Sequence, residues 1–257
     1  MKKLMVVMTA LLLLIMAACG TADEGTTGEG EKATEEKVLV MGTSADFAPF
    51  ESRNTDGEIV GFDIDLANYI ADELGYKLEI KDMKFDGLIG ALQTNRVDLV
   101  LSGMSATEKR AQNVDFSVHY NHSGEMFVTL KDSDIKTIDD LAGHKVGVQL
   151  GTIQEEGAVK IQETVDFELK RLDTAQLMIQ ELLSNRIDVA YLDKAVGAGY
   201  IKEQDLAGFD DPTSSSPGMA VAFPKGSELV DDVNKVIEQM EENGKLAELK
   251  EKWLSEE

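Results

Sequence analysis

Two stretches of the chain repeat the same order of residue types in its two halves. "LQTNRVDLVLSG" (92–103) and "LLSNRIDVAYLD" (182–193) each give a helix end, Asn-Arg, a β-branched residue, Asp and a strand that leads into polar residues. "VLVMGTSAD" and "HKVGVQLGTIQ" are a second matching pair, each a β run followed by Gly-Thr. Helix-then-strand units that recur in this way predict an α/β protein of two lobes built on one plan.

The rest of the chain fits this plan. Apolar residues at helical spacing in "DIDLANYIADELG" predict a helix that ends at Gly75. Strands are predicted at "VLVMGTS", "KLEIKDM" and "MAVAFP", and two closing helices are predicted on either side of Asn243-Gly244. A net charge of −23 excludes nucleic acid as a partner, because neutralising phosphates takes a basic patch.

The N-terminal residues form a unit of their own. Lys2-Lys3, an apolar run and Met16-Ala17-Ala18 predict a signal peptide over 1–18, too short to span a membrane comfortably. The small residues before Cys19 resemble a bacterial lipobox, although Met16 stands where leucine is usual. An ordinary signal peptide with a cysteine near the cut is the alternative.

Cys19 is the only cysteine, so an internal disulfide is excluded. Residues 19–37 are rich in Gly, Thr and Glu and predict a lipidated cysteine followed by a flexible acidic tether. We therefore expect a lipid-anchored protein on the extracytoplasmic face of the cell membrane, in a Gram-positive bacterium.

Polar residues follow several of the predicted strands. Ligands of open parallel sheets bind beyond the carboxyl ends of the strands. Two facing lobes would therefore form a cleft from four segments, 43–51, 102–110, 149–155 and 191–194.

Arg110 stands out in the second of these segments. Ser105 as N-cap with Glu108 makes "SATE" a capping box and puts Arg110 in the first helical turn, where the helix dipole disfavours a cation. An incoming carboxylate would justify the placement, and a plain surface arginine is the alternative.

The longer motifs carry a family resemblance. "GTSADFAPFES", "GEIVGFDIDLANYIADELG", "SGMSATEKRAQNVDFS", "KVGVQLGTIQEE" and "NRIDVAYLD" resemble the extracellular solute-binding proteins of family 3, the polar amino-acid receptors of ABC importers. The resemblance runs from Val38 to Trp253. It implies a type II periplasmic-binding-protein-like fold, in which each lobe is a mostly parallel sheet flanked by helices. Residues 38–123 plus 217–257 would form lobe 1 and 124–216 lobe 2, joined by two hinge strands.

The resemblance also implies a binding site for a free polar or basic amino acid. Arg110 matches the arginine that pairs with the ligand α-carboxylate, and Asp193 matches the acid that takes the α-ammonium. Phe47 and Phe85 match aromatic positions against the ligand side chain, although a lone Phe is more often part of a core. The carboxylate side is completed by Ser102, Gly103, Met104 and Ser105.

Several positions depart from the family pattern. Ser44 stands where many basic-amino-acid binders have an aspartate, so a strong preference for a cationic side chain is not implied. Ile153 replaces a frequent threonine, which leaves Gln149 and backbone N–H groups near Thr152 to hold more of the carboxylate. Asp46 and Glu51 are close in sequence, and the sequence leaves open that they face water.

The implied function is capture of an amino acid by hinge closure and delivery to a membrane permease, by a monomer without cofactor or metal. His119 and His122 near the expected hinge have no third ligand in the sequence nearby. An amino-acid-sensing lipoprotein without transport and a cyclic-acid lyase on the same fold are the alternatives. The segments expected to line the cleft hold no paired catalytic carboxylates and no Ser-His-Asp set, so we expect no enzyme activity. Arginine, lysine, glutamine and cystine-like ligands all stay open.

Overall fold

The computed structural model describes residues 37–214 and 216–255. The predicted signal peptide, the lipidated Cys19 and nearly all of the tether lie outside these residues. Within the described ranges, no helix is both long and apolar enough to cross a membrane.

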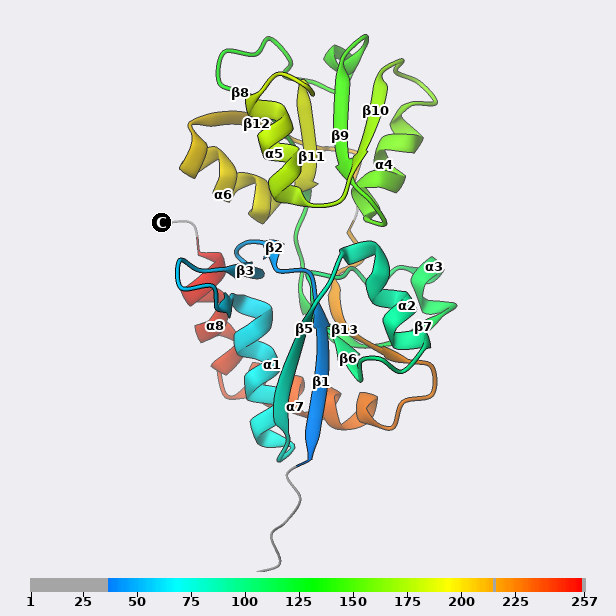
Figure 1. Cartoon of the computed structure of the whole chain (residues 1–257), viewed down its shortest axis with the longest axis vertical. Helices are drawn as coiled ribbons and strands as arrows, with labels where there is room; N and C mark the ends of the chain where they lie inside the picture. The colour runs from blue at the N-terminus through cyan, green and yellow to red at the C-terminus, as the bar shows by residue number, and fades with distance from the viewer. Residues whose placement is uncertain (1–36, 215, 256–257) are drawn as a thin grey trace, which may run out of the picture. The chain divides into compact units, whose positions relative to one another are not determined.

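Two five-stranded sheets organise the chain (Figure 1). We call lobe 1 the first sheet with its helices, and lobe 2 the second sheet with its helices. The strand order in lobe 1 is β5 (Lys77–Asp82), β1 (Val38–Thr43), β6 (Leu99–Val100), β13 (Met219–Pro224) and β7 (Val114–Asn121). The order in lobe 2 is β10 (Glu168–Leu172), β9 (Lys145–Gln149), β11 (Val189–Asp193), β8 (Glu125–Leu130) and β12 (Leu206–Asp210).

Both sheets are mixed, and in the same way. The first three strands of each order run parallel, and the last two pairings are antiparallel. The parallel part agrees with the mostly parallel sheets that we predicted, and the two antiparallel pairings per sheet were not foreseen. They arise because β8 and β13 are the strands that enter each sheet directly from the other lobe, without a crossover helix.

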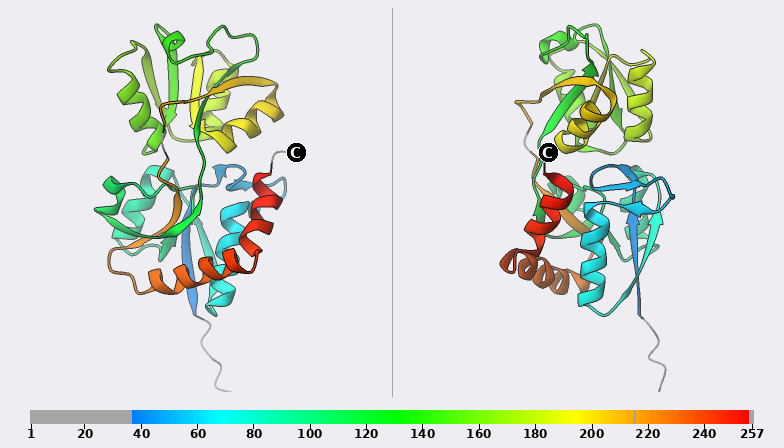
Figure 2. Two further views of the ribbon diagram at one scale, coloured as in Figure 1. Left: turned by 180° about the vertical axis from the view of Figure 1, so that it is seen from behind. Right: turned by 90° about the vertical axis from the view of Figure 1, so that its left-hand side faces the viewer.

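The helices cover the sheets. Lobe 1 carries α1 (Phe62–Glu73), η1 (Phe85–Gly87), α2 (Leu88–Gln93), α3 (Glu108–Ala111), α7 (Leu229–Glu242) and α8 (Lys245–Leu254), and lobe 2 carries η2 (Asp139–Leu141), α4 (Ile153–Ile161), α5 (Ala175–Leu183) and α6 (Lys194–Gln204). A small sheet of β2 (Asp46–Phe47), β3 (Glu51–Arg53) and β4 (Ile59–Val60) follows β1. The chain passes between the lobes from β7 to β8 and from β12 to β13 (Figure 2).

The repeated sequence motif has a structural explanation. Asn95 and Asn185 follow α2 and α5 with φ of 52° and 56°, the left-handed conformation that ends a helix. Two positions after the arginine, the Asp98 carboxylate accepts the Val40 N–H at 2.8 Å, and the Asp188 carboxylate accepts the Lys145 N–H at 2.8 Å. The motif therefore ends a helix and then ties the next strand to its parallel neighbour, β6 to β1 in lobe 1 and β11 to β9 in lobe 2.

Gly61 joins the small sheet to α1 and gives a test of the fold. Its φ is 142°, and a Cβ there would lie 2.1 Å from the carbonyl oxygen of Phe50. We expect Gly61→Ala to lower the free energy of unfolding by more than about 2 kcal/mol, as steric conflicts with the backbone do. Thermal unfolding measures this.

The matched control is Gly90→Ala in α2, where a Cβ meets nothing within 4 Å. That variant should gain up to about 1 kcal/mol from helix propensity. Equal melting temperatures for Gly61→Ala and the wild type would contradict the close approach of Gly61 to the Phe50 backbone.

Candidate functional site

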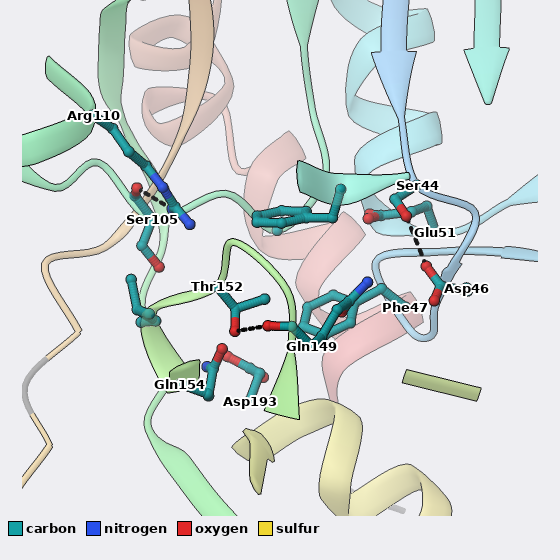
Figure 3. Close-up of a pocket in the computed structure, with 13 residues that line it drawn as sticks. Ser44, Asp46, Phe47, Glu51, Ser105, Arg110, Gln149, Thr152, Gln154 and Asp193 are labelled. Atoms are coloured by element: carbon teal, nitrogen blue, oxygen red, sulfur yellow. Dashed lines mark hydrogen bonds between the residues drawn. The ribbon is translucent and has the colours of Figure 1, made fainter. Parts of the chain in front are cut away.

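A cavity lies between the two lobes (Figure 3). Its empty volume of ≈ 370 Å³ includes open solvent at the mouth of the cavity. Lobe 1 lines it with Ser44, Asp46, Phe47, Glu51, Phe85, Gly103, Ser105 and Arg110, and lobe 2 with Gln149, Thr152, Ile153, Gln154 and Asp193. The four segments that the sequence pointed to therefore meet around one space, together with Phe85.

The helix that carries Arg110 begins later than we predicted. The N-cap of α3 is Thr107, whose Oγ1 accepts the Arg110 N–H at 3.2 Å. The predicted Ser105–Glu108 capping box is therefore wrong. Ser105 instead forms an isolated bridge with Met219, which holds it in extended chain before the helix. The four-residue α3 is also too short to sustain the helix-dipole argument that we made for Arg110.

The Arg110 guanidinium is a buried cation. The residue is 8% exposed, its Nη1 donates to the Ser105 carbonyl at 2.7 Å, and its Nη2 donates across to the Gly151 carbonyl of lobe 2 at 2.9 Å. The guanidinium lies 5.3 Å from the centre of the Phe85 ring. Among the described residues, no carboxylate forms an ion pair with it. Burial lowers its pKa to about 10, so it stays charged at neutral pH.

Asp193 lies on the other side of the cavity, at the end of β11. Its Oδ1 accepts the Ala195 N–H at 2.9 Å and the Ser123 hydroxyl at 3.0 Å, which fix its orientation. The residue is 4% exposed, and burial raises its pKa to about 6. Its carboxylate is therefore ionised at neutral pH but costly to bury, which favours a cationic partner in the cavity.

Glu51 does not face water. It is fully buried at the edge of the cavity, and its Oε1 accepts the Ser102 hydroxyl at 2.7 Å. Burial raises its pKa well above the usual value, and charge repulsion from Asp63 adds to the rise. The open alternative of a solvent-facing Glu51 is thus wrong, because Ser102 supplies the hydrogen bond that a buried carboxyl needs.

Asp63 is a supporting residue that the sequence reading missed. Its Oδ2 accepts the Gly103 N–H at 2.7 Å and the Tyr120 hydroxyl at 2.9 Å. These bonds hold Gly103 in the left-handed conformation, with φ of 52°, and a Cβ there would lie 2.9 Å from the Phe47 ring. Burial raises the pKa of Asp63 to about 7. The sequence held one sign of this role. Asp63 is an acid in the first turn of α1, on the helix face that the apolar residues mark as buried.

The lobe 2 wall is built around the start of α4. Thr152 is the N-cap, and its hydroxyl accepts the Glu155 N–H and donates to the Gln149 carbonyl at 2.7 Å. Gln149 Nε2 donates to the Asp173 carbonyl at 3.2 Å. Gln154 also lines the cavity; it lies in the predicted segment 149–155 but was not named among the site residues.

The structure brings most of the predicted residues together. Ser44, Phe47, Phe85, Gly103, Ser105, Arg110, Gln149, Thr152, Ile153 and Asp193 line the cavity. Ser102 and Met104 do not: Met104 is fully buried in the core of lobe 1, and Ser102 lies behind Glu51. The His119 and His122 rings pack edge to face with centroids 5.3 Å apart, and no group of metal-ligating side chains occurs in the part of the chain that is described.

Two lobes joined by two chain connections, with a charged cavity between them, define a protein that binds a small solute. The chain belongs to the bacterial extracellular solute-binding proteins, family 3, which match it over residues 39–256. It is 44% identical over 249 residues to the arginine-binding extracellular protein ArtP of Bacillus subtilis, covering 95% of this chain and 97% of ArtP.

Solved structures agree with this membership. An ancestral arginine-binding protein bound to arginine is 40% identical with a TM-score of 0.82, over 86% of this chain and 99% of that chain. The ancestral amino-acid-binding protein AncCDT-1, a precursor of cyclohexadienyl dehydratase, is 36% identical with a TM-score of 0.80. The match covers 85% of this chain and 96% of that chain. The similarity to binding proteins is therefore close, and one such protein is described as an enzyme precursor.

Proposed function

We propose that this substrate-binding component of an amino-acid ABC transporter captures arginine or a closely similar cationic L-amino acid. The observation that carries the proposal is the buried Arg110 cation, which has no acidic ion-pair partner among the described residues, in a cavity that also holds Asp193 and Glu51. A ligand with one carboxylate and two cationic groups would match these charges. ArtP and the ancestral protein, both named for arginine, support the choice of ligand.

The α-carboxylate would meet Arg110. A guanidinium offers a carboxylate two parallel hydrogen bonds, and burial strengthens them because water does not compete. Ser105 and Gly151, whose carbonyls accept from the guanidinium, lie at the same end of the cavity. The α-ammonium would meet Asp193, whose orientation is already fixed by Ser123 and Ala195.

The ligand side chain would lie near Phe47 and end at Glu51. The Phe47 ring stacks on Phe50 with centroids 5.9 Å apart, which gives a rigid apolar wall for an aliphatic stem. A guanidinium near Glu51 would favour the ionised carboxylate and relieve the cost of its burial. Asp46 is not needed as a ligand contact, because both of its carboxylate oxygens already accept hydrogen bonds from the protein.

The proposed mechanism is closure of the lobes over the ligand, since Arg110 and Asp193 come from different lobes and only a closed cleft pairs both ligand charges. We propose residues 38–123 plus 217–257 and 124–216 as the moving bodies, a membrane permease as the receiver and a lipid anchor on Cys19. No step of this mechanism changes the ligand chemically.

Thermal unfolding with the common amino acids, with citrulline included, tests the proposal. A ligand at a hundred times its Kd adds about 2.7 kcal/mol of stability. We expect arginine to give the largest rise in melting temperature, and its neutral analogue citrulline a smaller one. A panel in which no amino acid shifts the transition would refute capture. If a neutral amino acid gave the largest shift, the proposed role of Glu51 would be refuted. Mass spectrometry of the arginine recovered after binding would reveal any chemical change of the ligand.

A further inference from the structure

Asp46 lines the cavity, yet both of its carboxylate oxygens are already engaged by the protein. Oδ1 accepts the Ser44 hydroxyl at 2.9 Å, and Oδ2 accepts the backbone N–H of Ala175 at 2.9 Å. Asp46 belongs to β2 of lobe 1, and Ala175 is the first residue of α5 in lobe 2. The side chain therefore connects the two lobes directly at the edge of the site. Figure 3 shows its other hydrogen bond, from Ser44.

The contact is chemically well matched. The first N–H groups of a helix lack partners within the helix and carry a partial positive charge, so a carboxylate there is favourable. The cap of α5, Thr174, accepts the Leu177 N–H at 3.1 Å and leaves the Ala175 N–H to Asp46. The nine-residue α5 is long enough for its dipole to matter. Asp46 thus acts as a second cap, supplied from the other lobe.

The other side-chain contacts between the lobes differ in kind. Lys84 pairs with Asp173 at 2.5 Å and Lys109 pairs with Glu156 at 2.7 Å, and all four side chains are largely exposed. Exposed pairs of this type contribute little because water and salt screen them. Arg110 also donates to the Gly151 carbonyl of lobe 2, but its guanidinium is the group that we assign to the ligand carboxylate. The Asp46–Ala175 bond is partly buried, and unlike the contact of Arg110 it does not involve the group that meets the ligand carboxylate.

We infer that Asp46 is a positioning residue: by capping α5 across the cleft it holds the lobes closed and slows ligand release, without contacting the ligand side chain. This inference rests on the proposed function. It separates Asp46 from Glu51, which we assign to the ligand side chain. Loss of Asp46 should weaken all amino-acid ligands by the same factor, whereas loss of a side-chain contact would weaken cationic ligands selectively.

Asp46→Ala and Asp46→Asn test the inference, with Lys84→Ala as the control for an exposed contact between the lobes. We expect Asp46→Ala to raise the dissociation rate of radiolabelled arginine about tenfold, with the association rate unchanged within about twofold. Asp46→Asn keeps an oxygen acceptor and should fall between Asp46→Ala and the wild type. Lys84→Ala should change dissociation less than about twofold. The ratio of arginine to citrulline affinity, measured by calorimetry, should stay unchanged in all three.

A dissociation rate for Asp46→Ala equal to that of the wild type would overturn the inference, and so would a selective loss of arginine over citrulline. Amide hydrogen exchange at Ala175 in the ligand-free protein gives a readout without any amino acid. Exchange there should be faster in Asp46→Ala than in the wild type, and equal exchange would overturn the inference. A wild-type protein that binds no amino acid would refute the proposed function, and the exchange measurement would still decide on Asp46.

Discussion

Arg110→Gln lowers the affinity for the amino-acid ligand by about a hundredfold or more, because breaking a buried charge pair typically costs 3–5 kcal/mol. Glutamine keeps a hydrogen-bond donor but loses the charge and the two-pronged geometry that a carboxylate requires. Isothermal titration calorimetry with arginine measures the loss.

The same substitution should not destabilise the ligand-free protein much. Arg110 is a buried cation whose partners are two carbonyl oxygens, so its removal relieves a desolvation cost while it breaks two bonds. Arg96→Gln, at an exposed arginine in lobe 1, is the matched control for the change in charge and should bind normally. Affinity of Arg110→Gln within threefold of the wild type would remove Arg110 from the site.

Acidic pH weakens binding through Asp193. Burial places its pKa at about 6 in the ligand-free protein, and the α-ammonium pairs only with the ionised form. For citrulline, whose neutral side chain does not need ionised Glu51, the affinity should therefore be constant above about pH 7 and fall by about tenfold per pH unit once the pH drops well below 6. The sign follows from proton release: the bound state stabilises the carboxylate, so protons compete with the ligand.

Asp193→Asn should bind weakly at every pH and lose this slope. Citrulline is the sharper probe, because its neutral side chain forms no ion pair with Glu51 or the neighbouring Asp63. The pH dependence of its affinity therefore reports on Asp193. Calorimetry from pH 5 to pH 8 on both proteins gives the comparison. A wild-type slope that survives in Asp193→Asn would assign the pH dependence to another group.

Arg110 and Asp193, which line the cavity from opposite lobes, were predicted because each lies in a motif that matches the family pattern. Arg110 follows "SGMSATEK" and Asp193 ends the strand in "NRIDVAYLD". The two-lobe plan was equally visible, since its helix ends and strand-pairing aspartates recur in both halves. Each of these features depends on residues that are close together along the chain.

The errors have physical causes. We assigned Ser102 to Ser105 to the site as a block, but the chain bends at Gly103, whose φ is 52°, and this bend sends neighbouring side chains in different directions. Gly103 and Ser105 reach the cavity, while Ser102 and Met104 point into lobe 1. The burial of Glu51 depends on the Ser102 hydroxyl, which is distant in sequence, so no local pattern could reveal it.

Lobe 2 is one unbroken stretch of chain whose entry and exit strands are neighbours. In the β8–β12 pairing Met126 lies opposite Asp210, so the stretch begins and ends at nearly the same place. Such a segment can be exchanged for that of a relative by cutting the chain at two adjacent points. Five of the thirteen residues that line the cavity, including Gln149, Thr152 and Asp193, would be exchanged with it. Recombination between members of the family could therefore replace the lobe 2 wall of the cavity in a single event and leave Phe47, Glu51 and Arg110 of lobe 1 in place.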